Sequence, residues 1–266
     1  MELVGFVLAV LVGLSLGLLG GGGSILTVPL LVYVLGFGAK TAIAMSLPIV
    51  GVTSIIGALG HWRSGNLRLK TALLFGLVAM AGAFAGARLA GFLSGTVQLA
   101  TLAVVMLAAA VSMFRGGIHA DAAGSPDAAP ALPPLLASAL GVGVLTGTVG
   151  IGGGFLIVPA LVLFAQVPMK QAVGTSLLVI AMNSASGFAG YLGSVAVPWG
   201  FMAVFAGVAI LGVMVGTTLV RFVSQAQLRR AFAVFLVGVG LFTLYQNRSV
   251  FGGRQVEAAA SVPIRR

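Results

Sequence analysis

Ten apolar runs, separated by short polar connections, set the pattern of this 266-residue chain. Several of them reach the ~20 residues that a helix needs to cross a bilayer. No strand-like alternation competes with a helical interpretation, and strands in lipid would have to close into a barrel. We therefore predict an all-α polytopic membrane protein with roughly 8–10 transmembrane or re-entrant helical segments. The runs are Leu3–Leu19, Ser24–Phe37, Ala42–Gly60, Thr71–Leu93, Val97–Phe114, Leu135–Val149, Phe155–Val167, Ala172–Leu192, Trp199–Phe222 and Ala226–Tyr245.

The last five runs repeat the first five at a fixed offset. The stretch Gly17-Leu-Leu-Gly-Gly-Gly-Gly23-Ser-Ile-Leu-Thr-Val-Pro29 returns 130 positions later as Gly147-Thr-Val-Gly-Ile-Gly-Gly-Gly154-Phe-Leu-Ile-Val-Pro159. The offset continues beyond the motif without a gap, so that Lys40 maps to Lys170. A sustained period of this kind indicates duplication, and it predicts a fold made of two homologous repeats.

The length of the first two runs predicts that the repeats are inverted. As one helix, Leu3–Phe37 would be about 52 Å long at ~1.5 Å per residue, whereas the hydrocarbon core is ~30 Å thick. The two runs must form either two crossings or a re-entrant hairpin, and the three later runs then make the number of crossings odd. Charge agrees locally, because the loop His61–Lys70 has three basic residues and its counterpart Tyr191–Gly200 has none.

Composition divides the chain into two membrane units, a linker and a tail. Residues 1–115 form the first membrane repeat and residues 135–245 the second. Between them, residues 116–134 carry two acids and four prolines with little to bury, which predicts an aqueous linker rich in proline and alanine. Residues 246–266 are predicted to be a basic, disordered tail.

The low charge content excludes a soluble protein. Hydrophobic residues make up 59% of the chain and charged residues only 7%, with a mean hydropathy of +1.18; a soluble domain has about 25% charged residues. The net charge of +10 comes mainly from loops and the tail, where basic residues meet lipid head groups rather than nucleic acid. With no cysteine and two histidines, neither a metal site nor a cofactor is expected. The oligomeric state is left open.

Each repeat interrupts an apolar run with a cluster of glycines. Successive glycines are poor helix interior, and unpaired amides at membrane depth occur only inside protein or beside a wet cavity. The segment that follows starts a helix, whose first N–H groups and positive dipole end favour an anion. Such paired breaks indicate the binding site of a transporter. Close helix packing is the alternative, and we favour it for Gly82-x-x-x-Gly86 and Gly212-x-x-x-Gly216.

Hydroxyl and amide side chains share one face of the third run in each repeat. Helical spacing groups positions 46, 50, 53, 54 and 57, and likewise positions 176, 180, 183, 184 and 187. These groups either donate to an oxyanion or bond to neighbouring helices and their own carbonyls. Asn183 is the best single candidate. The predicted substrate-binding residues are Gly20, Gly21, Gly22, Gly23, Ser24, Ser46, Thr53, Ser54, Gly150, Gly152, Gly153, Gly154, Thr175, Ser176, Asn183 and Ser184.

Lys40 and Lys170 lie just before the third run of each repeat. They either attract anions at the mouth of the cavity or extend along the helix end toward the lipid head groups. His61, at the edge of a loop, is predicted to be solvated.

The four acids, Glu2, Asp121, Asp127 and Glu257, lie outside every predicted span. Proton-coupled carriers commonly place a carboxylate at depth. We therefore expect a coupling proton to travel on the substrate, or transport to follow the anion gradient. An enzyme is not expected, because no carboxylate dyad or nucleophile–base pair lies at depth.

Both halves carry Gly-x-x-Gly-x-Gly-Gly-Gly/Ser, then Val-Pro, then Lys-x-Ala-x-x-x-Ser-Leu, and this pattern resembles the TauE/SafE sulfite exporter family of membrane permeases. The resemblance covers Met1–Tyr245. It implies movement of small sulfur-containing anions, such as sulfite, thiosulfate or organosulfonates, across a bacterial-type inner membrane. We predict a secondary transporter that holds an oxyanion between the two breaks and works by alternating access. The alternatives are a channel or permease for another small solute and a non-transporting membrane scaffold.

Overall fold

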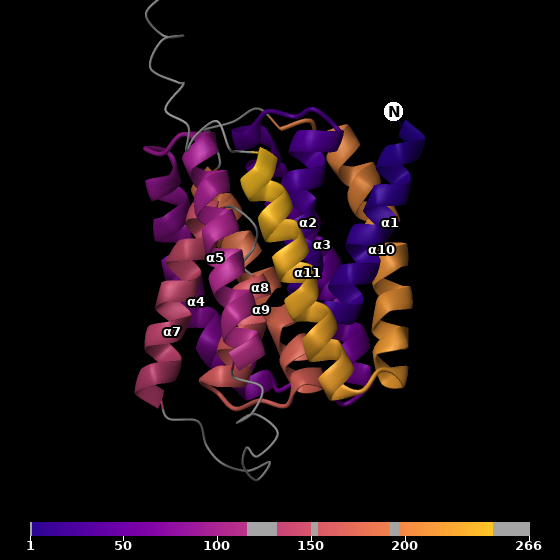
Figure 1. Cartoon of the computed structure of the whole chain (residues 1–266), viewed down its shortest axis with the longest axis vertical. Helices are drawn as coiled ribbons and strands as arrows, with labels where there is room; N and C mark the ends of the chain where they lie inside the picture. The colour runs from indigo at the N-terminus through magenta and orange to yellow at the C-terminus, as the bar shows by residue number, and fades with distance from the viewer. Residues whose placement is uncertain (1, 116–131, 150–153, 192–196, 247–266) are drawn as a thin grey trace, which may run out of the picture.

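The computed structural model describes residues 2–115, 132–149, 154–191 and 197–246 (Figure 1). In these residues it has ten α-helices, one π-helix, one 3-10 turn and no strand, which confirms the predicted all-α class. The first half contains α1 (Glu2–Leu19), α2 (Gly22–Pro29), the π-helix Leu30–Val34, α3 (Ala39–Arg63), α4 (Leu69–Ala90) and α5 (Gly95–Arg115). The second half contains α7 (Leu132–Val149), α8 (Gly154–Leu163), α9 (Met169–Tyr191), α10 (Trp199–Leu219), the 3-10 turn Val220–Phe222 and α11 (Gln225–Gln246).

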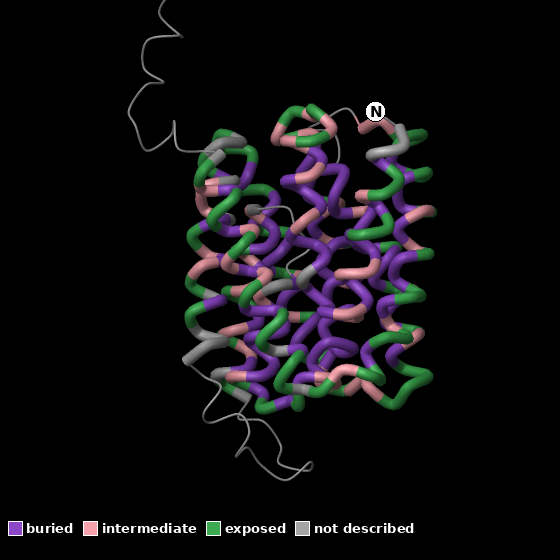
Figure 2. The backbone as a smooth tube through the Cα atoms, turned by 45° about the vertical axis from the view of Figure 1, so that its right-hand side comes forward, coloured by how far each residue is buried: buried purple, intermediate pink, exposed green. Residues whose placement is uncertain are grey.

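Within the described residues, five helical segments are long and apolar enough to cross a membrane: Ala39–Arg63, Leu69–Ala90, Met169–Tyr191, Trp199–Phe222 and Ala226–Tyr245. Large apolar side chains such as Leu77 and Leu211 are exposed on the outside of the bundle, whereas buried residues gather along its middle (Figure 2). An apolar exterior fits lipid rather than water. The prediction of an integral membrane protein is confirmed.

Helix α7 begins among the residues that the sequence assigned to the linker. Helix α7 begins at Leu132, so that Pro133 and Pro134 belong to its first turn and not to the linker. Proline is tolerated there because first-turn N–H groups have no intrahelical partner. Residues 116–131 and 247–266 lie outside the described part of the chain.

The chain reverses direction after α1. This helix starts at the top of Figure 1, runs downward and ends at Leu19. Only Gly20 and Gly21 are non-helical before α2 begins, so the interruption is shorter than the four-glycine run. A Cβ atom on Gly23 would overlap the backbone of Leu16, and this contact holds α2 against α1. The two runs therefore form a hairpin and not one continuous helix.

Helices α3 and α9 are the most buried of the five spanning helices, and they cross in opposite directions. A Cβ on Gly51 would lie 3.2 Å from the Cβ of Ser184, and one on Gly57 would lie 3.0 Å from Leu177. The residue numbers of the contacting positions add up to 235 and 234. A nearly constant sum is the register of two antiparallel helices. This register sets residues 51–54 of α3 beside residues 181–184 of α9, so that Thr53 and Ser54 lie within about one turn of Asn183 and Ser184, the positions that the 130-residue offset relates to them. At this crossing one member of each polar face, Gly57 on α3 and Ser184 on α9, contacts the other helix.

Glycines allow two other helix pairs to approach backbone to backbone. Cβ atoms on Gly82 and Gly86 of α4 would overlap the backbone of α7, and those on Gly212 and Gly216 of α10 would overlap α1. The partner helices supply glycines of their own, Gly143 and Gly147 on α7 and Gly13 and Gly17 on α1. Small residues permit such approach in lipid, so the packing interpretation of these glycines is confirmed.

We expect Gly143→Leu to lower the stability of the folded protein by about 1–3 kcal/mol, the usual range for overpacking. The new side chain would have to separate α7 from the backbone of Ala79 on α4. Gly141→Leu is the matched control, because Gly141 lies on the same helix, is exposed and has no atom within 4 Å of an added Cβ. Thermal unfolding in detergent measures the difference. Equal midpoints for the two variants would contradict the packing role.

Basic residues concentrate at one end of the bundle. Of the chain's 14, four lie beyond residue 246, outside the described part. Of the other ten, only Lys40 and Arg88 lie at the upper end in Figure 1. The remaining eight lie at the lower end, where α3, α5 and α10 finish and α4, α9 and α11 begin: Arg63, Arg68, Lys70, Arg115, Lys170, Arg221, Arg229 and Arg230.

Candidate functional site

The first glycine break lies against α9 in the interior of the bundle. Gly20 has a φ of +65°, the left-handed conformation that favours glycine. A Cβ there would stand 2.7 Å from Ser176 Oγ and 3.0 Å from the carbonyl oxygen of Val173. Two features therefore favour glycine at position 20: its left-handed backbone conformation and the close approach of α9.

The first break also touches the start of α8. A Cβ on Gly154 would overlap Gly21 Cα and the side chain of Ile180. Ile180 is the middle residue of the 23 in α9, so this contact lies at half the height of a spanning helix. Gly150, Gly152 and Gly153, predicted with Gly154 as the second break, fall outside the described residues. The described parts thus bring Gly21 of one half against Gly154 of the other.

The N-terminus of α2 is buried and has no side-chain cap. Its N-cap residue is Gly21, which carries no side chain to accept from the first amides. The Ser24 hydroxyl does not cap them either, since it donates to Gly21 O at 2.7 Å. Gly22, Gly23 and Ser24 form the first turn of the helix. The first N–H groups of an α-helix have no intrahelical acceptor, so this end of α2 offers donors to an anion.

Several predicted site residues use their hydroxyls locally. Ser46 donates to Ile43 O and Ser176 to Val173 O, both at 2.8 Å, while Thr53 donates to Ile49 O at 2.7 Å. A transmembrane serine or threonine commonly bonds to its own helix in this way. The hydroxyl oxygen of Thr175 accepts from the Arg68 backbone N–H at 3.0 Å, which ties the α3–α4 loop to α9. The hydroxyls of these four residues are therefore engaged in hydrogen bonds within the protein.

Three other residues of the predicted site have side-chain polar atoms without a hydrogen-bond partner among the described residues. Ser54 Oγ, Ser184 Oγ and both polar atoms of the Asn183 amide are buried and unpaired. An unsatisfied buried polar group carries a desolvation penalty of about 1–3 kcal/mol. All three lie at the α3–α9 crossing. Asn183 follows Ile180 by three positions on α9, so it is one turn away from the contact with Gly154 on the same side of the helix.

Lys40 and Lys170 occupy the first turns of α3 and α9, at opposite ends of the bundle. Lys40 is exposed and Lys170 is half-buried. Each is about 15 Å or more along its helix from the crossing, at 1.5 Å per residue. Neither lysine therefore belongs to the central group of polar side chains.

His61 is not solvated, and its predicted exposure is wrong. Only 1% of the residue is accessible, because α1, α9 and the following loop cover it. Its Nε2 lies 3.0 Å from Gly17 O, in the last turn of α1. The equivalent residue in the second half, Tyr191, donates its hydroxyl to Gly147 O at 3.3 Å. The 130-residue offset relates His61 to Tyr191 and Gly17 to Gly147. This correspondence of the two pairs is visible in the sequence.

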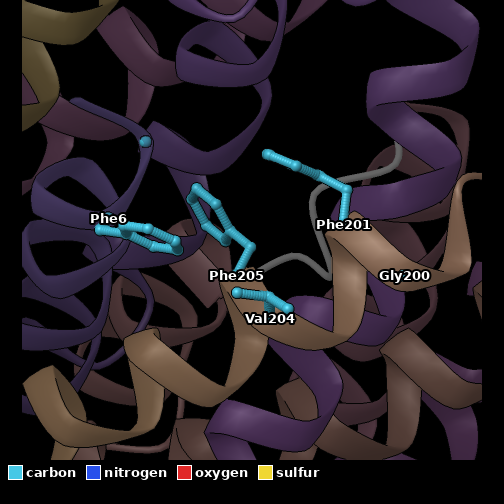
Figure 3. A pocket seen from close by; sticks show the side chains of 6 residues that line it. Phe6, Gly200, Phe201, Val204 and Phe205 are labelled. Atoms are coloured by element: carbon cyan, nitrogen blue, oxygen red, sulfur yellow. The ribbon is translucent and has the colours of Figure 1, made fainter. Parts of the chain in front are cut away.

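An apolar groove of about 340 Å³ opens between the first two turns of α1 and of α10 (Figure 3). Phe6, Phe201, Val204 and Phe205 line it, together with Gly5 and Gly200. These residues supply no side-chain donor for an oxyanion. The groove is also near the upper ends of its helices rather than at the glycine break. It is therefore not a candidate anion site.

Comparison with known proteins gives a consistent result. The family model described as "Sulfite exporter TauE/SafE" matches residues 5–243. A "Probable membrane transporter protein" of Xylella fastidiosa is 33% identical over 241 residues, covering 89% of this chain and 92% of the relative. The "Probable membrane transporter protein YdhB" of Bacillus subtilis is 27% identical over 237 residues, covering 88% and 97%. No solved structure matches the chain.

Proposed function

The chain belongs to the TauE/SafE sulfite exporter family of membrane transporters, and we propose that it moves small sulfur-containing oxyanions across the inner membrane by alternating access. Sulfite, thiosulfate and organosulfonates are the expected class. One observation carries the proposal: the first glycine break meets the start of α8 at half the height of α9, one turn from the unpaired amide of Asn183.

The anion would be held by neutral donors. The uncapped amides of the first turn of α2 offer N–H groups and the positive end of a helix dipole. Asn183 adds an amide N–H, and Ser54 and Ser184 add hydroxyls, all buried and without partners among the described residues. An oxyanion with three or more oxygens can accept from several of these groups at once. Their lack of formal charge would let the anion leave as readily as it enters.

Alternating access would use the two hairpins. In Figure 1, α1 enters the bundle from the top and α7 from the bottom. We propose that the halves are inverted repeats and that α1–α2 and α7–α8 move in turn against the α3–α9 crossing, around one central site. The glycine contacts of α1 with α10 and of α7 with α4 would carry α10 and α4 along with the hairpins.

The distribution of charge supports one orientation of the protein. Eight of the ten basic residues in the described part lie at the lower end of the bundle. Short loops rich in lysine and arginine remain on the cytoplasmic side. We propose that this end faces the cytoplasm, which places the start of α1 on the outer side.

Flux into proteoliposomes tests the proposed function. Purified protein is reconstituted and assayed with sulfite, sulfate, thiosulfate, sulfoacetate and chloride. We expect saturable uptake of sulfite, thiosulfate or the sulfonate, accelerated by the same anion on the opposite side. Uptake without saturation or exchange would indicate a channel. If none of these anions moves, the proposal fails and a scaffold becomes the better interpretation.

A further inference from the structure

The hydrogen bond from His61 to α1 places a titratable ring beside the glycine break. His61 Nε2 lies 3.0 Å from Gly17 O, and Gly17 precedes Gly20 by three residues. If Nε2 carries the hydrogen that is donated to this carbonyl, the other ring nitrogen is free to accept a proton. Nδ1 is buried and has no partner among the described residues. The ring therefore holds the end of α1 with one nitrogen and keeps the other available.

Within the described part of the chain, the elements around His61 carry no acidic residue near this end of the bundle. The ring is covered by α1 at Gly17, by α9 at Gly174 and by the loop at Asn66. The charged residue of α1 is Glu2, at the opposite end of that helix. On the other elements around His61, the charged residues near this end are all basic: Arg63, Arg68, Lys70, Arg115, Lys170 and Arg221. No carboxylate within the described part of the chain is placed to pair with a protonated ring.

We propose that His61 binds a proton when an anion binds at the first glycine break, and that it releases the proton when the anion leaves. This inference rests on the proposed function, because it assumes that the break holds an anion. The anion supplies the negative charge that the described surroundings of the ring lack. Nδ1 takes one proton from water on binding and returns it on release, so that one proton accompanies each anion held. This proton is carried by the protein, in contrast to the expectation from the missing acids at depth that a coupling proton travels on the substrate.

Thermodynamic linkage makes the coupling reciprocal. If the anion favours the protonated ring, the protonated ring favours the anion by the same factor. Anion affinity should therefore rise as the pH falls. For one coupled proton, the change is limited to about tenfold per pH unit. The affinity is to be measured between about pH 5 and 8, where an unperturbed histidine is the side chain that changes charge.

The second half of the chain suggests a variant that separates titration from structure. Tyr191 bonds to Gly147 O as His61 bonds to Gly17 O, and a tyrosine does not ionise between about pH 5 and 8. His61→Tyr would keep a donor for Gly17 O and remove the titratable ring. Thiosulfate and methanesulfonate are suitable probes because both stay fully ionised in this range, whereas sulfite changes its own charge.

We expect the apparent affinity for thiosulfate in proteoliposomes to increase at low pH for the unmodified protein and to be independent of pH for His61→Tyr. Calorimetry in buffers of different ionisation enthalpy should detect uptake of up to one proton per thiosulfate bound, and none for the variant. His119→Gln removes the other histidine, and Tyr191→Phe removes the equivalent hydrogen bond. Both should keep the slope against pH.

These experiments distinguish failure of the proposed function from failure of the proposed role of His61. If the unmodified protein transports no anion, the proposed function fails. If it transports thiosulfate and His61→Tyr shows the same slope and proton uptake, only the role of His61 is overturned. If His61→Tyr folds and binds without transporting, the calorimetric comparison still decides the question, because proton uptake is measured at the binding step.

Discussion

Replacing Asn183 with alanine is expected to reduce anion transport by at least about tenfold while the protein unfolds at the same or a higher temperature. A hydrogen bond to a charged group contributes about 1.5–3 kcal/mol, and 1.4 kcal/mol corresponds to a factor of ten. Both polar atoms of the amide are buried and unpaired among the described residues. Alanine removes their desolvation penalty, so stability need not fall with activity. Transport kinetics in proteoliposomes and thermal unfolding in detergent measure the two effects.

Thr146→Val is the matched control for Asn183→Ala. Both residues are 1% exposed, but the Thr146 hydroxyl donates to Gly143 O on its own helix at 2.9 Å. The control should keep transport, since its hydroxyl is already satisfied away from the break. Unchanged transport by Asn183→Ala would remove this residue from the site. A loss of stability as large as the loss of transport would assign it a structural role instead.

The helical class and the membrane location could be predicted because both depend on local composition. Runs of about 20 apolar residues leave few folds other than membrane helices. The repeated Gly-x-x-x-Gly spacing also contained enough information, since Gly82 and Gly86 must lie on one side of α4 whatever that helix contacts. The identity of the facing helix was not available from spacing alone, because it depends on how segments far apart in the chain come together.

Helical spacing could not tell which polar side chains are available to a ligand. It grouped Ser46 and Thr53 with Ser54 on one face of α3, yet their hydroxyls bond to Ile43 O and Ile49 O of the same helix. A serine or threonine hydroxyl can reach a carbonyl three or four residues back, and only coordinates reveal whether it does.

The wrong prediction for His61 has a similar cause. Position at a loop edge suggested solvation, but α1 and α9 cover that edge and bury the ring. Burial by elements distant in sequence is the property that a local pattern describes least well. The better signal was the match between His61 and Tyr191, each 44 residues beyond the glycine whose carbonyl it contacts.

Gly154→Ala is expected to reduce transport at least tenfold, a factor that corresponds to about 1.4 kcal/mol. The added methyl group would occupy the space where Gly154 meets Gly21 and Ile180. It would push the start of α8 and Gly21, the N-cap of α2, apart, and so displace the α2 amides proposed to hold the anion. Misplacement of a binding group by about 1 Å can cost a hundredfold in activity. Initial rates of thiosulfate uptake, compared at equal amounts of reconstituted protein, measure the effect.

Overpacking also destabilises a fold by about 1–3 kcal/mol, so this variant needs a control with a similar clash elsewhere. Gly190→Ala supplies this control. Gly190 lies one residue before the end of α9, and an added Cβ there would stand 2.6 Å from the Cβ of Ala87 on α4. We expect both variants to lose stability and only Gly154→Ala to lose transport at a temperature where both are folded. Equal loss of transport in the two would mean that activity follows general packing. The meeting of Gly21 with Gly154 would then be a structural contact rather than half of an anion site.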